Sequence, residues 1–286
     1  MPQFLLSEHN YGKRYKMTAS DKRYVHGYSA YEAARLVDQA TTLTELLHSD
    51  TSYPAGSSVL EAGCGVGAQT VTLLKNSPDA HFTSIDVSQA SLDAARERVN
   101  AAGHTNIRFQ QADIFDLPFD NSSFDHIFVC FVLEHLKDPH DALVHLRKKL
   151  KRSGTITVIE GDHGSTYFHP QSSDAWQTIQ CLIELQARVG GNSLIGRQLF
   201  PILTAAGFSN VHVSPRMVYV DSSKPEYVEG FTKNTFIAMV EGVQAEAIRS
   251  GMIDEKKWHK GIQDLYRTTA QDGTFCYTFF KGVACR

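Results

Sequence analysis

Residues 57–70 read SSVLEAGCGVGAQT, and this stretch decides the fold. The short apolar run Val59–Leu60 leads into Gly63, Gly65 and Gly67, and a helix-forming run follows directly. A strand, a tight turn and a helix in this order bring backbone N–H groups and a helix N-terminus against a ligand. Glycine suits the turn because a Cβ atom would block both the positive φ angles and the close approach of the ligand. By itself the spacing also fits a dinucleotide fingerprint, so it does not identify the ligand.

Length and composition set the limits of the interpretation. The chain has 286 residues, enough for one large domain or for a core domain with an appended cap. A hydrophobic share of 42% suffices for a buried core, and the net charge is −3 with both signs mixed throughout. We expect no nucleic-acid partner, because no basic patch follows a phosphate backbone. We also expect no membrane partner, because the longest uncharged apolar run, 127–133, is too short to span a bilayer.

The cysteines and the N-terminus indicate a cytoplasmic protein. Five cysteines are scattered without C-x-x-C spacing, which favours reduced thiols over a disulfide framework or a zinc site. The first ten residues lack the charged and apolar regions of a signal peptide. No metal is expected either, since the candidates Asp162, His163 and His169 do not make a set of three well-spaced ligands.

The first segment, 1–49, is predicted to form an N-terminal cap or lid. It is rich in tyrosine, and an amphipathic helix is predicted from Ser29, with Ser29 as its N-cap and Glu32 three residues later. The alternative is a plain packing helix. The residues that precede this helix include the rings of Tyr24, His26 and Tyr28, which makes a lid an equally strong expectation.

From residue 59 to 161 strands and helices alternate at short intervals, which predicts a parallel sheet covered on both faces. Strands are predicted at 81–85, 107–111, 124–131 and 154–159, with helices between them. Ser88 is expected to cap one helix, and Asp138–Pro139 to begin another.

Acidic residues at three strand ends separate the candidate ligands. Asp86 follows Gly63 by 23 residues, where a carboxylate would hold the ribose hydroxyls of an adenosyl or a nicotinamide cofactor. Glu61 precedes the loop, placed to bind an ammonium group, and Asp113 could accept from an adenine amino group. A pyrophosphate disfavours an extra carboxylate beside it, whereas the zwitterionic S-adenosylmethionine tolerates one.

These segments resemble the successive motifs of class I S-adenosylmethionine-dependent methyltransferases, over roughly residues 57–160. The resemblance implies an α/β fold: a doubly wound, Rossmann-like sheet of seven mostly parallel strands in the order 3-2-1-4-5-7-6, with strand 7 antiparallel. The sequence of this chain adds the N-terminal helical cap and inserted helices to that sheet. The segments that carry the resemblance are Glu61–Gly67, Asp86, Gln111–Asp113, Phe124–Asp125 and Val132–His135.

The resemblance also implies how the cofactor binds, with S-adenosyl-L-homocysteine as its product. Gly63, Gly65 and Gly67 would approach the methionine part with Glu61 beside it, and Asp86 and Asp113 would bind the ribose and the adenine. Ile114 would flank the adenine and Phe131 would line the pocket. The cofactor-binding half is therefore placed at 50–161.

Residues 162–286 are predicted to form the acceptor half of the same domain. Helices are expected at 176–189, 197–206, 225–250 and 255–269, and closing strands at 211–220 and 274–284. Additions of this size typically build a substrate chamber or a subunit interface, so a homo-oligomer is also considered. In layout, the chain is similar to bacterial natural-product C-methyltransferases of secondary metabolism that act on indole compounds.

Methyl transfer needs positioning and exclusion of water more than it needs reactive groups. Aromatic faces suit a sulfonium; Tyr28 is a candidate on the cofactor side, and the acceptor candidates are Tyr24, His26, Tyr167, Phe168 and Tyr277. If the acceptor must lose a proton, Glu160 and His163 are the candidate bases, since Glu160 is expected at the carboxyl end of the fifth strand. His135, after the fourth strand, is the further catalytic candidate or a capping residue.

The leading hypothesis is methyl transfer to a small organic acceptor, with an electron-rich aromatic such as an indole as one option. A protein or RNA methyltransferase is the second hypothesis, although it would want an open basic groove. A non-catalytic module that only binds the cofactor is the third.

Overall fold

The computed structural model describes residues 30–286, with side chains described from Gln39 onward. Within this range one sheet of seven strands has the order β3-β2-β1-β4-β5-β7-β6, so the predicted fold is confirmed. Its strands are β1 (Ser58–Ala62), β2 (His81–Asp86), β3 (Ile107–Gln111), β4 (Phe124–Cys130), β5 (Leu150–His169), β6 (Ser209–Val220) and β7 (Thr274–Cys285). Strand β7 is antiparallel to both of its neighbours.

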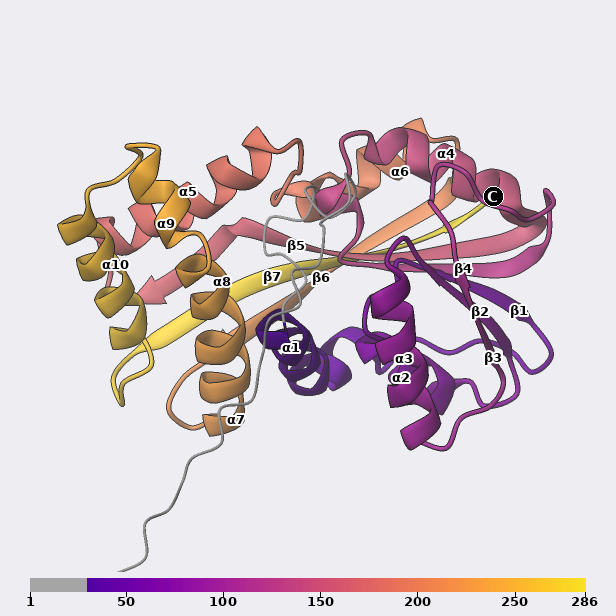
Figure 1. Cartoon of the computed structure of the whole chain (residues 1–286), viewed down its shortest axis with the longest axis horizontal. Coiled ribbons are helices and arrows are strands. Elements are labelled where there is room, and N and C mark those ends of the chain that lie inside the picture. Colours follow the sequence, from indigo (N-terminus) through magenta and orange to yellow (C-terminus); the bar gives the residue numbers. More distant parts are fainter. Residues whose placement is uncertain (1–29) are drawn as a thin grey trace, which may run out of the picture.

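The two faces of the sheet bury alternate residues of the central strands, as the pleat requires. Val59 and Phe128 belong to the core beneath α1 (Ala30–His48), α2 (Ala68–Asn76) and α3 (Gln89–Ala101). Leu60 and Ile127 belong to the opposite core, beneath α4 (Pro139–Lys149) and α6 (Leu199–Ala205). Figure 1 shows these two helix layers on opposite sides of the sheet.

The predicted helix starts are confirmed where side chains cap them. Ser88 accepts a hydrogen bond from the N–H of Ser91 at the start of α3. Asp138 accepts one from the N–H of Asp141, and Pro139 is the first residue of α4. Both caps occupy backbone N–H groups that have no partner within the helix.

A buried lysine ties the end of α1 to the sheet. Lys281 of β7 is 3% exposed, and its Nζ donates to the carbonyl of Leu47 at 3.3 Å and to Thr51 Oγ1 at 2.5 Å. It also pairs with Asp50 at 2.5 Å. The contacts satisfy the ammonium group and hold the C-terminal end of α1 on the sheet. Ser29, the predicted cap of this helix, lies outside the described residues.

The prediction that the fifth strand ends at Ile159 is wrong, because β5 continues to His169. Its pairing with β7 runs to Asp162, shifts register, and resumes at Tyr167 opposite Cys276. The glycines and polar residues of 160–166 are typical of a loop. Here β7 pairs with residues 160–162. Beyond them the His163 N–H donates to the Ser193 carbonyl at 2.9 Å and the Gly164 N–H to Asp162 Oδ1 at 3.1 Å, so these backbone groups have partners that a loop would find in water.

The long strands β5 and β7 carry a second group of helices, on the left of Figure 1. These are α5 (Ser173–Arg188), α7 (Pro225–Tyr227), α8 (Ala238–Glu241), α9 (Gln244–Arg249) and α10 (Glu255–Arg267). The single helical region predicted at 225–250 is instead divided, with a π-helix, η3 (Val228–Ile237), between α7 and α8. Two 3₁₀ turns, η1 (Leu133–His135) and η2 (Ile195–Gln198), complete the fold. In the described part of the chain, no helix combines the length and apolar character needed to cross a bilayer.

Candidate functional site

The glycine loop between β1 and α2 contains three left-handed residues. Gly63, Gly65 and Gly67 have φ angles of 78°, 51° and 75°. A Cβ atom on Gly63 would lie 2.4 Å from the Val132 side chain, and one on Gly67 would lie 2.9 Å from Ala95. A Cβ atom on Gly65 would meet nothing within 4 Å. Two glycines thus allow close packing, and the middle one faces open space where a ligand can approach the backbone.

Asp86 lies at the end of β2, beside this loop, as the sequence predicts. Its Oδ2 accepts from the Gly65 N–H and its Oδ1 from the Ser88 N–H, both at 2.9 Å. Burial raises the pKa of this carboxyl group, against these hydrogen bonds. The Val87 backbone is a third donor to this carboxylate. A carboxylate has about four acceptor sites, so Asp86 can hold the loop and still accept from a ligand hydroxyl.

Glu61 lies beneath the loop and is 2% exposed. Its Oε2 accepts from Thr70 Oγ1 at 2.8 Å and from Ser84 Oγ at 2.5 Å. Burial raises its pKa to about 7, although the two hydroxyl donors act in the opposite direction. The charge of Glu61 therefore changes near neutral pH, and its predicted contact with an ammonium group stays a prediction.

The remaining predicted cofactor residues follow β3 and β4. Asp113 is exposed, and its Oδ1 accepts from the Phe115 N–H at 2.9 Å. Ile114 next to it is 8% exposed. Phe131 directly follows β4 with a φ of 57°, and its ring centroid lies 5.5 Å from that of Phe279. These positions border the carboxyl edge of the sheet, where ligands bind in open parallel sheets.

Glu160 is not at a strand end, which corrects the prediction for it. It lies within β5 and is 0% exposed. Its Oε1 accepts from the N–H groups of Val132 at 3.0 Å and Leu133 at 2.8 Å, at the start of η1. Burial and the neighbouring Glu134 raise its pKa well above the ordinary range. This placement favours a structural role, holding the turn after β4, over the predicted role of a general base.

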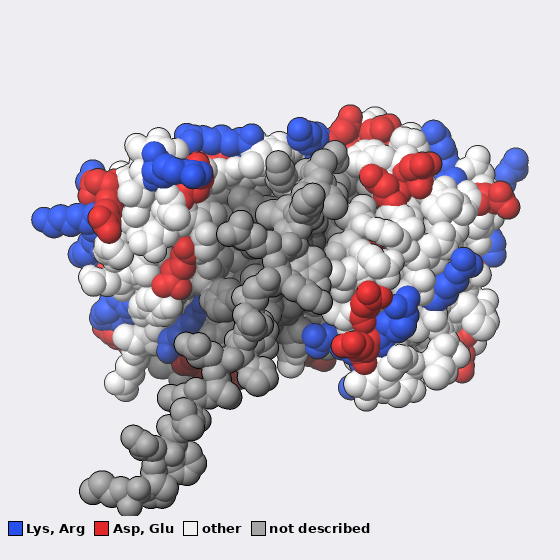
Figure 2. Space-filling model, viewed as in Figure 1, with Lys and Arg blue, Asp and Glu red and all other residues white. Residues whose placement is uncertain are grey.

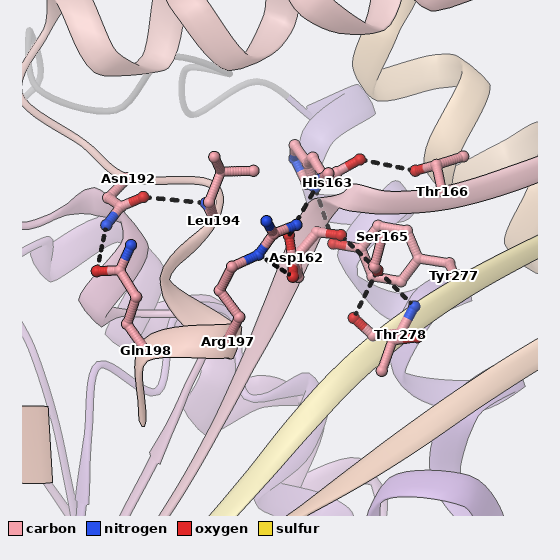
Figure 3. Close-up of polar contacts among 11 residues, drawn as sticks. Asp162, His163, Ser165, Thr166, Asn192, Leu194, Arg197, Gln198, Tyr277 and Thr278 are labelled. Atoms are coloured by element: carbon pink, nitrogen blue, oxygen red, sulfur yellow. Dashed lines mark hydrogen bonds and ion pairs between the residues drawn. The ribbon is translucent and has the colours of Figure 1, made fainter. Parts of the chain in front are cut away.

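Two further residues of β5, Asp162 and His163, face different partners (Figure 3). Asp162 is 1% exposed and accepts two hydrogen bonds from Arg197 of η2, at 2.6 and 2.8 Å. His163 is 4% exposed, and its Nδ1 lies 2.8 Å from the Tyr277 hydroxyl oxygen. The structure thus brings together His163 and Tyr277, which the sequence predicts separately as a catalytic and an acceptor-binding residue.

His135, the other catalytic candidate, lies in η1 after β4. Its Nε2 is 3.6 Å from Glu134 Oε1, and its side chain is 21% exposed. The catalytic role of His135 stays a prediction.

Of the predicted acceptor residues, Tyr24 and His26 lie outside the described residues, as does Tyr28 on the cofactor side. Tyr167 is 71% exposed on β5, so the structure does not enclose it in a chamber. Phe168 is 8% exposed and packs against Trp176 and Phe275 as part of the core. Adjacent strand residues point to opposite faces, which is why these two neighbours differ so strongly.

Sequence reasoning missed an aromatic cluster around Tyr277. Phe279 of β7 lies 4.7 Å from the Tyr277 ring centroid, and Phe231 and Phe236 of η3 lie at 5.7 and 5.6 Å. The alternation Phe275, Tyr277, Phe279 in the last strand is the signal that could have indicated a shared aromatic face.

Residues 60–158 match the family model described as a methyltransferase domain. Demethylmenaquinone methyltransferase of Clavibacter sepedonicus is 34% identical over 106 residues, which cover 37% of this chain and 42% of that protein. Malonyl-[acyl-carrier protein] O-methyltransferase of a Paenibacillus species is 26% identical over 212 residues, covering 73% of each. The chain spans about half or less of the length of several other curated relatives that it matches.

Among solved structures, the chain resembles phosphoethanolamine N-methyltransferase 2 of Haemonchus contortus. That protein was determined with phosphomonomethylethanolamine and S-adenosylhomocysteine. The TM-score is 0.58 over 94% of this chain and 61% of that chain, at 14% identity. At this identity the likeness shows a common fold.

Proposed function

We propose, on the premise that the chain belongs to the class I S-adenosylmethionine-dependent methyltransferases, that it transfers a methyl group to a small organic acceptor. The observation that carries the proposal is the loop at Gly65. A Cβ atom there would meet no protein atom within 4 Å, and the loop's N–H is held by Asp86. A ligand can therefore lie against this backbone at the N-terminal end of α2.

The residues present fit S-adenosylmethionine, which supplies an electrophilic methyl group on a sulfonium. In this proposal Asp86 accepts from the ribose hydroxyls, Asp113 and Ile114 bind the adenine, and Phe131 lines the pocket. The open backbone at Gly65 takes the methionine part. Because the reaction disperses the sulfonium charge, positioning and exclusion of water provide most of the rate, and no strong acid or base is needed for the donor.

A small acceptor is supported by two observations. The names of two relatives refer to acceptors of this kind, a demethylmenaquinone and a malonyl group on a carrier protein. On the described part of the face in Figure 2, Lys and Arg are interspersed with Asp and Glu. That mixture does not favour the basic groove expected for an RNA acceptor. An electron-rich aromatic acceptor, such as an indole, is the more specific form of the proposal.

The proposal includes the division of the chain into a cap (1–49), a cofactor half (50–161) and an acceptor half (162–286). Because β5 runs across residue 161, the two halves share one sheet. All five cysteines are free thiols, which supports a reducing compartment such as the cytoplasm. Assembly into a homo-oligomer stays part of the proposal.

Replacing Asp86 by alanine tests the cofactor site. The change removes acceptors for the ligand hydroxyls and for the Gly65 and Ser88 N–H groups. We expect the affinity for S-adenosylhomocysteine, measured by calorimetry, to fall by about 2 kcal/mol. Unchanged affinity, or tight binding of a nicotinamide dinucleotide by the wild type, would contradict the assignment. Release of S-adenosylhomocysteine during turnover with an acceptor separates an enzyme from a module that only binds.

The pKa of about 7 at Glu61 predicts a pH-dependent affinity for the cofactor. Only the ionised carboxylate attracts the ligand's ammonium group, so affinity should rise between pH 6 and pH 8. Glu61→Gln, which cannot ionise, should bind with an affinity that is nearly flat over this range. Calorimetry with S-adenosylhomocysteine at several pH values measures both. If both proteins respond equally to pH, Glu61 does not contact the ammonium group.

A further inference from the structure

One buried polar pair stands among aromatic rings. The Tyr277 hydroxyl and His163 Nδ1 are 2.8 Å apart, and the two residues are 2% and 4% exposed. The Phe236 ring lies 6.0 Å from the His163 ring at 82°, and the Phe279 ring lies 4.7 Å from that of Tyr277. We call these rings, together with Phe131, the aromatic wall. Polar groups are costly to bury in apolar surroundings, so the presence of this pair in the aromatic wall calls for an explanation.

An irregularity of the sheet sets the position of His163. Asp162 pairs with Thr278 and Tyr167 with Cys276, so residues 163–166 of β5 stand opposite Tyr277 alone. The Ser165 hydroxyl accepts from the Thr278 N–H at 2.9 Å and donates to the Asp162 carbonyl at 2.7 Å, closing the gap (Figure 3). Bulges of this kind re-aim side chains and are frequent beside active sites.

A missing side chain makes room for the Tyr277 hydroxyl. A Cβ atom on Gly161 would lie 2.4 Å from that hydroxyl oxygen. The backbone at Gly161 is not left-handed, so steric space is what this position requires of its residue. Gly161 and the bulge thus act independently, and each places one half of the pair.

The pair is connected to the cofactor loop by ring contacts. Tyr277 contacts Phe279, and Phe279 contacts Phe131 at 5.5 Å. Phe131 is followed by Val132, whose side chain lies against Gly63 of the loop. The aromatic wall therefore extends from the cofactor loop to the polar pair.

We propose that the Tyr277 hydroxyl and the His163 imidazole anchor the methyl acceptor through an N–H or O–H group, with the acceptor's aromatic body against this wall. The Tyr277 oxygen also accepts from the Asp162 backbone. When His163 Nδ1 accepts the Tyr277 O–H, the oxygen therefore keeps one acceptor position for the ligand, and when Nδ1–H donates, the Tyr277 O–H can donate to the ligand. Burial and the nearby Glu134 and Asp162 raise the pKa of Tyr277 well above the ordinary range, so the hydroxyl stays neutral. The substrate class is an aromatic alcohol, an aromatic amine or an N–H heterocycle.

In this proposal a ligand reaches the pair by a movement of η3, whose Phe231 and Phe236 rings pack against Tyr277. The π-helix is a rare conformation, and π-helical turns are frequent at functional sites. The inference deepens the proposed function and rests on it.

The experiment uses phenol and toluene, two probes of nearly equal size in which an O–H group takes the place of a methyl group. Each is titrated into the full chain with saturating S-adenosylhomocysteine. Tyrosines labelled with ¹³C at the hydroxyl-bearing carbon report binding by NMR, and the Tyr277→Phe spectrum identifies the Tyr277 resonance. We expect phenol to move that resonance, and Tyr277→Phe to lower the affinity for phenol relative to toluene about tenfold.

Two further variants complete the test. Gly161→Ala keeps both members of the pair but displaces the Tyr277 hydroxyl, so it should also lower the ratio of the affinity for phenol to that for toluene. Tyr53→Phe removes the hydroxyl of a buried tyrosine that packs against Phe82 and His126, and it should leave the ratio unchanged.

The outcomes separate this inference from the proposed function. A ratio that is the same in wild type, Tyr277→Phe and Gly161→Ala overturns the inference, as does a Tyr277 resonance that phenol does not move. Failure of the wild type to bind S-adenosylhomocysteine, measured separately by calorimetry, overturns the proposed function instead.

Discussion

Replacing Gly65 by alanine should lower the affinity for S-adenosylhomocysteine about 100-fold, with only a modest loss of stability. The new Cβ atom meets no protein atom within 4 Å, so it stands in space that the ligand needs. Overpacking by one methyl group costs up to about 3 kcal/mol, which is a factor of about 100 in affinity. Calorimetry gives the affinity, and chemical denaturation gives the free energy of unfolding.

Gly56→Ala is the matched control for this experiment. Gly56 has a φ of 76° and also meets nothing within 4 Å of an added Cβ atom, but it lies before β1, away from the loop. Both variants should lose about 1–2 kcal/mol of stability, the cost of a left-handed alanine. Only Gly65→Ala should lose affinity. Equal affinities for S-adenosylhomocysteine in the two variants would show that the ligand does not contact the Gly65 backbone.

Replacing Glu160 by alanine should destabilise the fold by about 3–5 kcal/mol. The change leaves the Val132 and Leu133 N–H groups buried without their acceptor, and it opens a void in the core. Glu97→Ala, at an exposed position of α3, should change stability by no more than about 0.5 kcal/mol. Denaturant unfolding measures both. A small effect at Glu160 would contradict its role in holding the turn after β4.

Glu160→Gln isolates the charge, because its amide oxygen can still accept from the same N–H groups. The folded-state pKa of Glu160 is raised above the ordinary value of 4.5. The stability that this group contributes is therefore fully present below about pH 4.5 and is lost as the pH rises through the folded-state pKa. Relative to the wild type, Glu160→Gln should become more stable with rising pH, by at most about 1.4 kcal/mol per pH unit.

Parallel pH profiles for the two proteins would show that Glu160 does not ionise differently on folding. The variant also tests the role predicted from the sequence. If Glu160 were a general base, Glu160→Gln should slow turnover by about 10²–10⁴-fold and leave the free energy of unfolding unchanged.

Local signals in the sequence were sufficient for the cofactor half. The glycine loop, the acid at the end of β2, the Ser88 cap and the Asp138–Pro139 start are all short-range patterns, and each is confirmed in position. They hold because turn geometry and helix capping depend on residues that lie within a few positions of one another. The strand order followed from the family resemblance.

The acceptor half could not be predicted to the same depth. Residues 160–166 read as a loop, and the pairing of β7 with residues up to 162 and again from 167 makes this stretch part of a strand. The same pairing places Glu160 inside a strand. Its side chain is therefore a buried acceptor for the N–H groups at the start of η1, whereas the sequence predicted a base at the edge of the sheet. The π-helix at 228–237 had no recognisable pattern in the sequence.

The sequence by itself determined the fold class, the glycine loop and the carboxylates placed around it, because each depends on local backbone chemistry. Only the tertiary structure decided which distant side chains meet. His163 and Tyr277 are 114 positions apart and form a pair because β5 and β7 are neighbours in the sheet and the Gly161 backbone leaves room between them. Strand neighbours are selected by the burial of whole faces of the sheet, and no short stretch of the chain encodes that selection.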